Sequence, residues 1–242
     1  MQRWTSDSHI TKSLCEALKI PRGITAVIGA GGKTSLCNRL GQELCHKGKV
    51  ILTTTTHIWQ PQGLPLACNR EEAEKLLWHA SLICVGQSVG EGKLGQPADG
   101  VAPLAQLADY VIVEADGAKG LPLKAHGGHE PAIPSQADRK IAVCGLKGLG
   151  KPIAETVHRP EICARLLGVD QKHRMTPRDL QQLLEAYPPF DVLVANQADA
   201  ADCLDAGRRL ASLWRNTPVT IAALAQPEPI LEQWEDGALC WC

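Results

Sequence analysis

Residues 29–35 read Gly-Ala-Gly-Gly-Lys-Thr-Ser and have the side chains and backbone freedom needed to bind a phosphate group. Glycines let backbone N–H groups close around phosphate oxygens, and a helix that begins directly after them offers further N–H groups to the same anion. The predicted phosphate-binding residues are Gly29, Ala30, Gly31, Gly32, Lys33, Thr34 and Ser35. Lys33 would reach the outer phosphates, and the hydroxyl of Thr34 or Ser35 would hold Mg²⁺.

The spacing departs from the full phosphate-loop motif, which has another glycine where Val27 stands. An ordinary glycine-rich turn before a helix is therefore the alternative. The apolar stretch before the loop and the helical pattern after it favour phosphate binding.

A second polar motif, Glu114-Ala-Asp116-Gly117, follows the apolar stretch at residues 110–113. An acidic residue at the tip of a buried strand can orient Mg²⁺ or its water opposite the Lys-Thr pair. We therefore predict Glu114 and Thr34 as the Mg²⁺ ligands, Asp116 as the residue that positions water, and Gly117 as an N–H donor to the terminal phosphate. Lys33, Glu114 and Asp116 form the predicted catalytic set. The alternative is a strand that simply ends in a polar turn.

A third motif, Asn196-Gln197-Ala-Asp199, follows the apolar stretch at residues 192–195. A carboxylate at Asp199 could accept hydrogen bonds from the ring N–H and the exocyclic amine of guanine. Adenine lacks this donor pair and would leave the carboxylate unpaired. Gln197 stands where GTPases usually have lysine, so the prediction is GTP, with ATP as the other candidate.

Two further polar segments could contact a ligand. Residues 53–57 read Thr-Thr-Thr-Thr-His at the end of an apolar stretch, which favours a nucleotide-sensing loop over a plain strand. Residues 118–131 form a long glycine-rich segment, and long structured loops are often functional. His126 and His129 could ligate a metal if further ligands were near, and Lys119 and Lys124 could contact a substrate phosphate. The predicted substrate or switch residues are Thr54, Thr55, His57, Lys119, Lys124, His129 and Glu130.

The three motifs together resemble the P-loop GTPases that act as metallochaperones for nickel and cobalamin enzymes. Thr-Thr-Thr-His57 and residues 114–131 are more closely similar to the selenium-dependent hydroxylase accessory protein family, the YqeC type. That family commonly has Lys-Ala-Pro where this chain has Lys124-Ala-His126, whereas His129 and Glu130 match. The resemblance implies a P-loop fold and a role in maturing a selenium-containing molybdenum hydroxylase, with that enzyme or its cofactor as partner.

Strand and helix patterns alternate along the chain, which predicts an α/β fold: one three-layer P-loop NTPase-like domain over residues 1–242, with a mainly parallel sheet. Helices are expected at about 8–19, 33–47, 71–79, 161–167, 176–184 and 201–214. Strands are expected at 24–28, from 50 into the polar residues 53–57, and at 82–85, 110–114, 140–144, 191–195 and 219–223. Residues 1–21 would pack on the domain, 86–100 would form a loop or hairpin, 145–150 a connector, and 151–188 a covering helical layer.

Composition excludes several classes of protein. Hydrophobic residues make up 44% and charged residues 21%, and the formal net charge of −1 gives no electrostatic reason to expect nucleic acid. The first residues contain no apolar signal core, and no stretch approaches the roughly 18 apolar residues of a membrane span, so we expect a cytoplasmic protein. Ten cysteines form no C-x-x-C pair. Cys84 and Cys144 should be buried, and Cys240 with Cys242 could bind a soft metal or lie in a frayed tail.

The leading hypothesis is a Mg²⁺-dependent GTP-binding protein whose slow hydrolysis drives maturation of a metal cofactor. One alternative is a kinase or nucleotidyltransferase whose small substrate is held by Lys119, Lys124 and His129. Another is a non-catalytic module in which the nucleotide orders a docking surface. The sequence leaves open whether the chain forms a homodimer.

Overall fold

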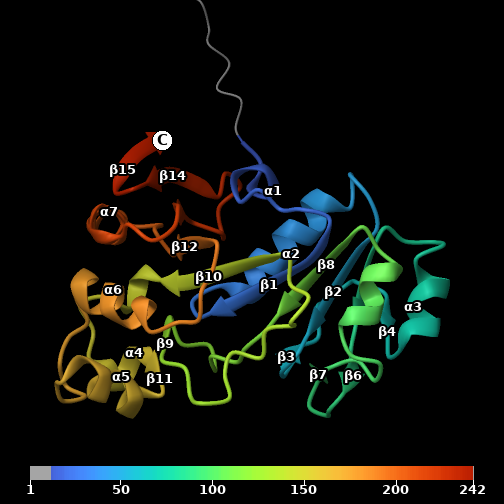
Figure 1. Ribbon diagram of the computed structural model, residues 1–242, viewed down its shortest axis with the longest axis horizontal. Helices are drawn as coiled ribbons and strands as arrows, with labels where there is room; N and C mark the ends of the chain where they lie inside the picture. The colour runs from blue at the N-terminus through green and yellow to red at the C-terminus, as the bar shows by residue number, and fades with distance from the viewer. Residues whose placement is uncertain (1–11, 242) are drawn as a thin grey trace, which may run out of the picture.

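The fold is built on one ten-stranded sheet with helices on both faces, seen in a computed structural model that describes residues 12–241 (Figure 1). Its strands are β1 (Gly23–Gly29), β2 (Val50–Thr54), β4 (Leu66–Ala67), β5 (Leu82–Val85), β8 (Tyr110–Glu114), β10 (Arg139–Gly145), β12 (Val192–Asn196), β13 (Val219–Ala222), β14 (Ile230–Glu235) and β15 (Ala238–Trp241). Their order is β15-β14-β13-β12-β10-β1-β8-β2-β5-β4. Strands β13 to β4 in this order pair in parallel, and β14 and β15 are antiparallel. The predicted α/β class with a mainly parallel sheet is confirmed.

Strand β1 lies between β8 and β10, where both faces of the sheet are covered. Its side chains alternate between two apolar cores, because successive residues of a strand point to opposite faces. Val27 packs in one core, and Ala26 and Ile28 pack in the other. Continuous apolar residues in these central strands are what a sheet buried on both faces requires.

The helices divide between the two faces. Helices α1 (Leu14–Ala17) and α2 (Lys33–Leu44) pack with Val27. The opposite face carries α3 (Arg70–Leu76), η1 (Ala102–Gln106), η2 (Leu146–Gly148), α4 (Ile153–Thr156), α5 (Pro160–Leu167), α6 (Pro177–Glu185) and α7 (Ala201–Leu213). Helix α6 is capped by Thr176, which forms a reciprocal capping box with Asp179.

Both ends of the chain differ from the sequence expectation. The helix expected at 8–19 is the short α1 within the described residues, and the positive φ of 50° at Lys19 ends it; residues 8–11 lie outside the described range. The expectation of a last strand near residue 223 was incomplete, because β14 and β15 follow it. The prediction of a frayed tail is therefore wrong for Cys240, which lies in β15. Cys242 lies outside the described residues.

Short strands organise the loops. Strands β3 (Ile58–Trp59), β6 (Gln87–Ser88) and β7 (Lys93–Gly95) form a small sheet, which confirms the hairpin alternative for residues 86–100. Strands β9 (Leu123–Lys124) and β11 (Val157–His158) pair in parallel and join the long loop at 118–131 to the layer of α4, α5 and α6 (Figure 1). The loop is therefore held by this strand pairing rather than free.

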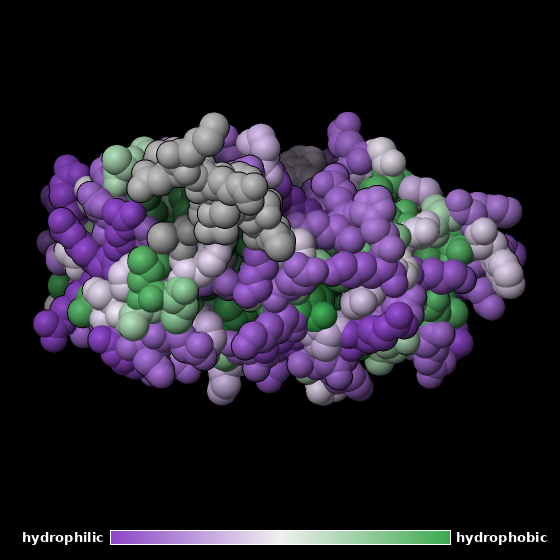
Figure 2. All heavy atoms as spheres, turned by 90° about the horizontal axis from the view of Figure 1, so that it is seen from above, coloured by the Kyte–Doolittle hydropathy of each residue, from purple (hydrophilic) through white to green (hydrophobic). Residues whose placement is uncertain are grey.

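The surface in Figure 2 is mostly hydrophilic, with apolar side chains in small scattered groups. Cys84 and Cys144 are buried as expected. Among residues 12–241, no helix combines the length and apolar character that a membrane span needs.

Candidate nucleotide-binding site

The glycine-rich loop lies between the carboxyl end of β1 and the start of α2. Helix α2 is capped by Gly32 without a side-chain hydrogen bond, so its first N–H groups point out as donors for an anion. Gly31 has a φ of +77°, and a Cβ there would lie 2.4 Å from the backbone nitrogen of Gly145. Only glycine fits this position, which explains the residue type that made the motif recognisable.

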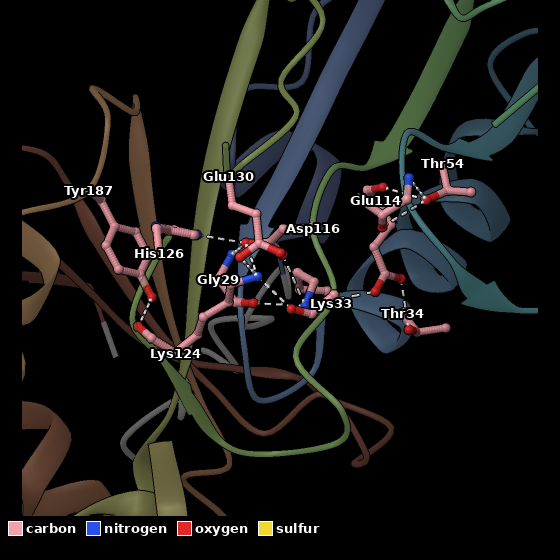
Figure 3. A network of polar contacts seen from close by, with 12 residues as sticks. Gly29, Lys33, Thr34, Thr54, Glu114, Asp116, Lys124, His126, Glu130 and Tyr187 are labelled. Carbon is pink, nitrogen blue, oxygen red and sulfur yellow. Dashed lines mark hydrogen bonds and ion pairs between the residues drawn. The ribbon is translucent and has the colours of Figure 1, made fainter. Parts of the chain in front are cut away.

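Lys33 lies at the centre of a network of charged side chains (Figure 3). Its Nζ donates to the carbonyl oxygen of Gly29 at 2.7 Å, and it lies 3.2 Å from Asp116 Oδ1 and 3.8 Å from Glu114 Oε1. The residue is only 5% exposed. The structure therefore brings all three residues of the predicted catalytic set together and pairs the buried cation with two carboxylates.

Glu114 also connects to the start of α2. Thr34 Oγ1 donates to Glu114 Oε2 at 2.8 Å, so a hydroxyl and a carboxylate oxygen lie side by side. These are hard oxygen donors of the type Mg²⁺ prefers, and Mg²⁺ sites commonly use one or two protein oxygens with water and phosphate oxygens completing the shell. The arrangement fits Mg²⁺ and singles out Thr34 over Ser35, because the hydroxyl that contacts Glu114 is that of Thr34. Burial raises the pKa of Glu114, and Lys33 offsets part of that rise.

Asp116, the second carboxylate beside Lys33, is fully buried. Its Oδ2 accepts the N–H of Gly29 at 2.9 Å and contacts His126 Nε2 at 2.7 Å. Burial alone would raise the pKa of Asp116, but the His126 hydrogen bond and the charges of Lys33 and Lys124 bring that pKa below its usual range. These contacts favour a role in holding the loop over the predicted role in positioning water.

The segment 118–131 contributes a second buried cation. Lys124 is fully buried, and its Nζ lies 3.0 Å from Glu130 Oε2 and 3.6 Å from Asp116 Oδ2. Glu130 in turn accepts two contacts from Arg159, each at 3.1 Å. Burial would raise the pKa of Glu130, but hydrogen bonds from Arg159 and Lys124 lower it. A chain of alternating charges thus runs from the glycine-rich loop to the start of α5.

Tyr187 connects this network to the layer of helices α4, α5 and α6. Its hydroxyl donates to the carbonyl oxygen of Lys124 at 2.7 Å, and its ring packs on His126 with centroids 4.1 Å apart (Figure 3). His126, which departs from the resembled family, is therefore an integral part of the network. Tyr187 and Arg159 carry no motif that sequence analysis could use, since they lie far along the chain from the loop they contact.

Asn196 braces the loop. Its Nδ2 donates to the carbonyl oxygen of Gly31 at 2.7 Å, and its Oδ1 accepts the N–H of Leu224 at 2.9 Å. Asp199 stands apart from it, and its Oδ2 lies 2.8 Å from Nζ of Lys147. Within the third motif, Asn196 therefore contacts the glycine-rich loop, whereas Asp199 contacts Lys147. Lys147 was missed, because residues 145–150 were interpreted as a connector.

The other predicted residues divide into two groups. Thr54 Oγ1 donates to the carbonyl oxygen of Glu114 at 2.7 Å, and Thr55 Oγ1 donates to that of Ala132 at 2.7 Å, so both lie beside the network. The remaining three, His57, Lys119 and His129, are exposed. Among residues 12–241, no three or more histidine, cysteine or acidic side chains gather as a metal site would require, and the structure gives no support to the proposed pairing of His126 and His129 on a metal.

Comparison with known proteins agrees with the resemblance of the motifs. The profile of the YqeC protein family matches residues 25–161, which is more than half of the chain. The chain belongs to this family. A curated relative, "Uncharacterized protein YqeC" of Escherichia coli (strain K12), is 36% identical over 173 residues, which are 66% of this chain and 67% of the relative.

The family match covers the glycine-rich loop, Glu114, Asp116 and the segment up to Arg159, and it ends before Asn196 and Asp199. Among solved structures, the signal recognition particle 54 kDa protein of Aeropyrum pernix K1 in complex with GDP is 17% identical, with a TM-score of 0.39. That match takes in 86% of this chain and 43% of the other, so the chain spans less than half the length of that protein. A similarity this distant leaves the ligand to be argued from the site itself.

Proposed function

We propose that this chain binds Mg²⁺ and a nucleoside triphosphate, preferentially GTP, at the glycine-rich loop and hydrolyses it slowly. The observation that carries the proposal is the position of Lys33 at the start of α2, beside Glu114 and the Thr34–Glu114 contact of 2.8 Å. A cation, free helix N–H groups and an acid beside a hydroxyl are the parts that phosphoryl-transfer sites share.

The residues of the chain would act in sequence. Phosphate oxygens would accept from the N–H groups at the start of α2 and draw Lys33 away from its carboxylates. Thr34 and Glu114 would hold Mg²⁺, which neutralises charge on the transferring phosphoryl group. Asp116 would keep the N–H of Gly29 in place, and Asn196 would keep the carbonyl of Gly31 turned away from the phosphates.

The preference for GTP rests on Asp199. A carboxylate can accept from both guanine donors, whereas adenine offers no such pair. The resemblance to the selenium-dependent hydroxylase accessory proteins supplies the wider role that we propose: a cytoplasmic accessory protein for maturation of a molybdenum hydroxylase. The transferase alternative is weakened because Lys124, one of its three substrate-holding residues, is buried and paired with Glu130.

The decisive experiment is calorimetric titration of the purified protein with GTP, ATP and CTP, with Mg²⁺ and with chelator. We expect Mg²⁺-dependent binding of GTP, lost in Thr34→Ala and retained in Ser35→Ala, because only Thr34 contacts Glu114. Binding that is equal with and without Mg²⁺, or equal in the two variants, would overturn the proposed Mg²⁺ site. An absence of any nucleotide binding would overturn the function.

Product analysis separates the alternatives. A GTPase releases GDP and phosphate without an acceptor, whereas a kinase or nucleotidyltransferase yields a modified small molecule. A docking module binds GTP tightly and shows no turnover even with a molybdenum hydroxylase present.

A further inference from the structure

The pairing of Asp199 with Lys147 bears on how the proposed site distinguishes bases. The Nζ of Lys147 lies 2.8 Å from Asp199 Oδ2. The lysine side chain is 52% exposed and the aspartate side chain 22% exposed. The lysine can therefore exchange its partner for water at low cost, whereas the carboxylate is held in a partly enclosed position.

The backbone on both sides of Lys147 is fixed. Leu146 is buried, and its Cδ1 would lie 2.9 Å from a Cβ added at Gly207 of α7. Gly148 packs so closely that a Cβ there would lie 2.7 Å from Thr156 Oγ1. This packing holds the backbone of Lys147 in place, so the lysine is anchored where its side chain can reach Asp199.

Lys147 changes the relative free energies of binding guanine and adenine. Guanine has two N–H donors for the carboxylate and needs both of its oxygens, so the base must displace the lysine from Oδ2. Adenine offers neither donor. With adenine bound, an aspartate standing alone would be buried and unpaired, at a substantial cost. Here the lysine can remain on the carboxylate and remove that cost.

From this juxtaposition we infer that Lys147 is a specificity-determining residue which weakens the discrimination between guanine and adenine nucleotides. It competes with guanine for Asp199 and it satisfies Asp199 when adenine is bound. The inference rests on the proposed nucleotide site and identifies the residue that sets its base preference.

The test is titration of wild-type protein and the Lys147→Gln variant with Mg²⁺-GTP and Mg²⁺-ATP. Partly exposed ion pairs contribute about 0.2–1 kcal/mol, so we expect GTP to bind about 1.4- to fivefold more tightly to Lys147→Gln. ATP should bind more weakly, so that the ratio of GTP to ATP affinity rises. Lys147→Arg should restore the wild-type ratio, because it retains the cation.

The matched control is Lys151→Gln, which removes the same charge from an exposed lysine four positions along the chain. It should leave both affinities at the wild-type values. In Asp199→Asn, the additional substitution Lys147→Gln should have no further effect on the ratio, since the carboxylate it competes for is gone.

Three results would overturn the inference. Equal shifts in Lys147→Gln and Lys151→Gln would show a general effect of charge. An unchanged ratio in Lys147→Gln, with GTP binding that still requires Thr34, would leave the nucleotide site standing and remove Lys147 from base selection. Failure of wild-type protein to bind either nucleotide would overturn both proposals together.

Discussion

Asn196 donates its side-chain amide to the carbonyl oxygen of Gly31 and accepts the backbone N–H of Leu224. One buried side chain therefore ties the glycine-rich loop to the segment that follows β13. We expect Asn196→Ala to lower the free energy of unfolding by about 1–3 kcal/mol, because two buried backbone groups lose their partner. It should weaken GTP and ATP alike.

Asp199→Ala is the matched comparison, because it lies in the same motif and contacts neither backbone group. It should change the GTP to ATP ratio with little change in stability. Thermal unfolding and nucleotide titration of both variants check this division. A selective loss of GTP in Asn196→Ala would contradict it.

The close approach at Gly31 predicts a steric block. An alanine Cβ would lie 2.4 Å from the backbone nitrogen of Gly145 and 2.7 Å from the carbonyl oxygen of Pro122. Gly31→Ala should therefore displace the loop and reduce nucleotide affinity by at least tenfold, about 1.4 kcal/mol. The control is Gly63→Ala, where φ is +75° and no atom lies within 4 Å. That variant should lose only about 1 kcal/mol of stability, because a residue with a Cβ is strained in this left-handed backbone conformation. It should bind nucleotide normally.

The buried position of Glu114 predicts a conflict between stability and function. Burial raises its pKa, so its folded pKa lies above the unfolded value of about 4.3. Such a group stabilises the fold below its unfolded pKa, and this contribution is lost as the pH rises through the folded pKa. At pH 7.5 we expect Glu114→Gln to increase the free energy of unfolding of the nucleotide-free protein by about 1 kcal/mol, while Mg²⁺-dependent binding is lost.

The pH dependence is the check on this explanation. The stability gain of Glu114→Gln should shrink towards pH 4, where the wild-type carboxyl is mostly protonated in both the folded and the unfolded state. Urea unfolding at pH 7.5 and pH 4 measures the gain, and equal gains at both pH values would contradict the role of ionisation.

The pKa of Glu130 shifts in the opposite direction to that of Glu114. Hydrogen bonds from Arg159 and Lys124 bring its pKa below the usual value, so it stabilises the fold above about pH 4.3 and loses this effect as the pH falls through its folded pKa. Glu130→Gln should lower the free energy of unfolding at pH 7 by about 2 kcal/mol, because Lys124 loses its nearest carboxylate. Glu161→Gln, an exposed acid in α5, serves as the control. A difference between wild type and Glu130→Gln that persisted unchanged at pH 3.5 would argue against the ion pair.

The fold was largely predictable because its central strands are continuous apolar stretches and its helices show regular spacing. The hairpin of β14 and β15 was missed although Asp236 and Gly237, both with positive φ, form its turn. Asp-Gly is a typical hairpin turn and could have been recognised. The buried Glu232 on β14, paired with Arg208 of α7, obscures the alternation that marks a strand.

The site was predictable only where its residues belong to short local motifs. Motifs typical of phosphate and Mg²⁺ binding contain Lys33, Thr34 and Glu114. The structure brings these three residues together. Lys147, Arg159 and Tyr187 reach the site from distant elements through single contacts. No spacing rule connects such residues, since sheet order and helix packing decide which of them meet.

In the protein without nucleotide, the carboxylates of Glu114 and Asp116 are the counter-ions of the buried Lys33 cation. A phosphate group entering the loop must take the place of an existing partner, so its electrostatic gain is the difference between two pairings. In the hydrolytic cycle that we propose, Glu114 and Asp116 would remain beside Lys33 and would pair with it again once the phosphate leaves. These carboxylates would then favour release of product and return to the starting state over tight retention of the product nucleotide.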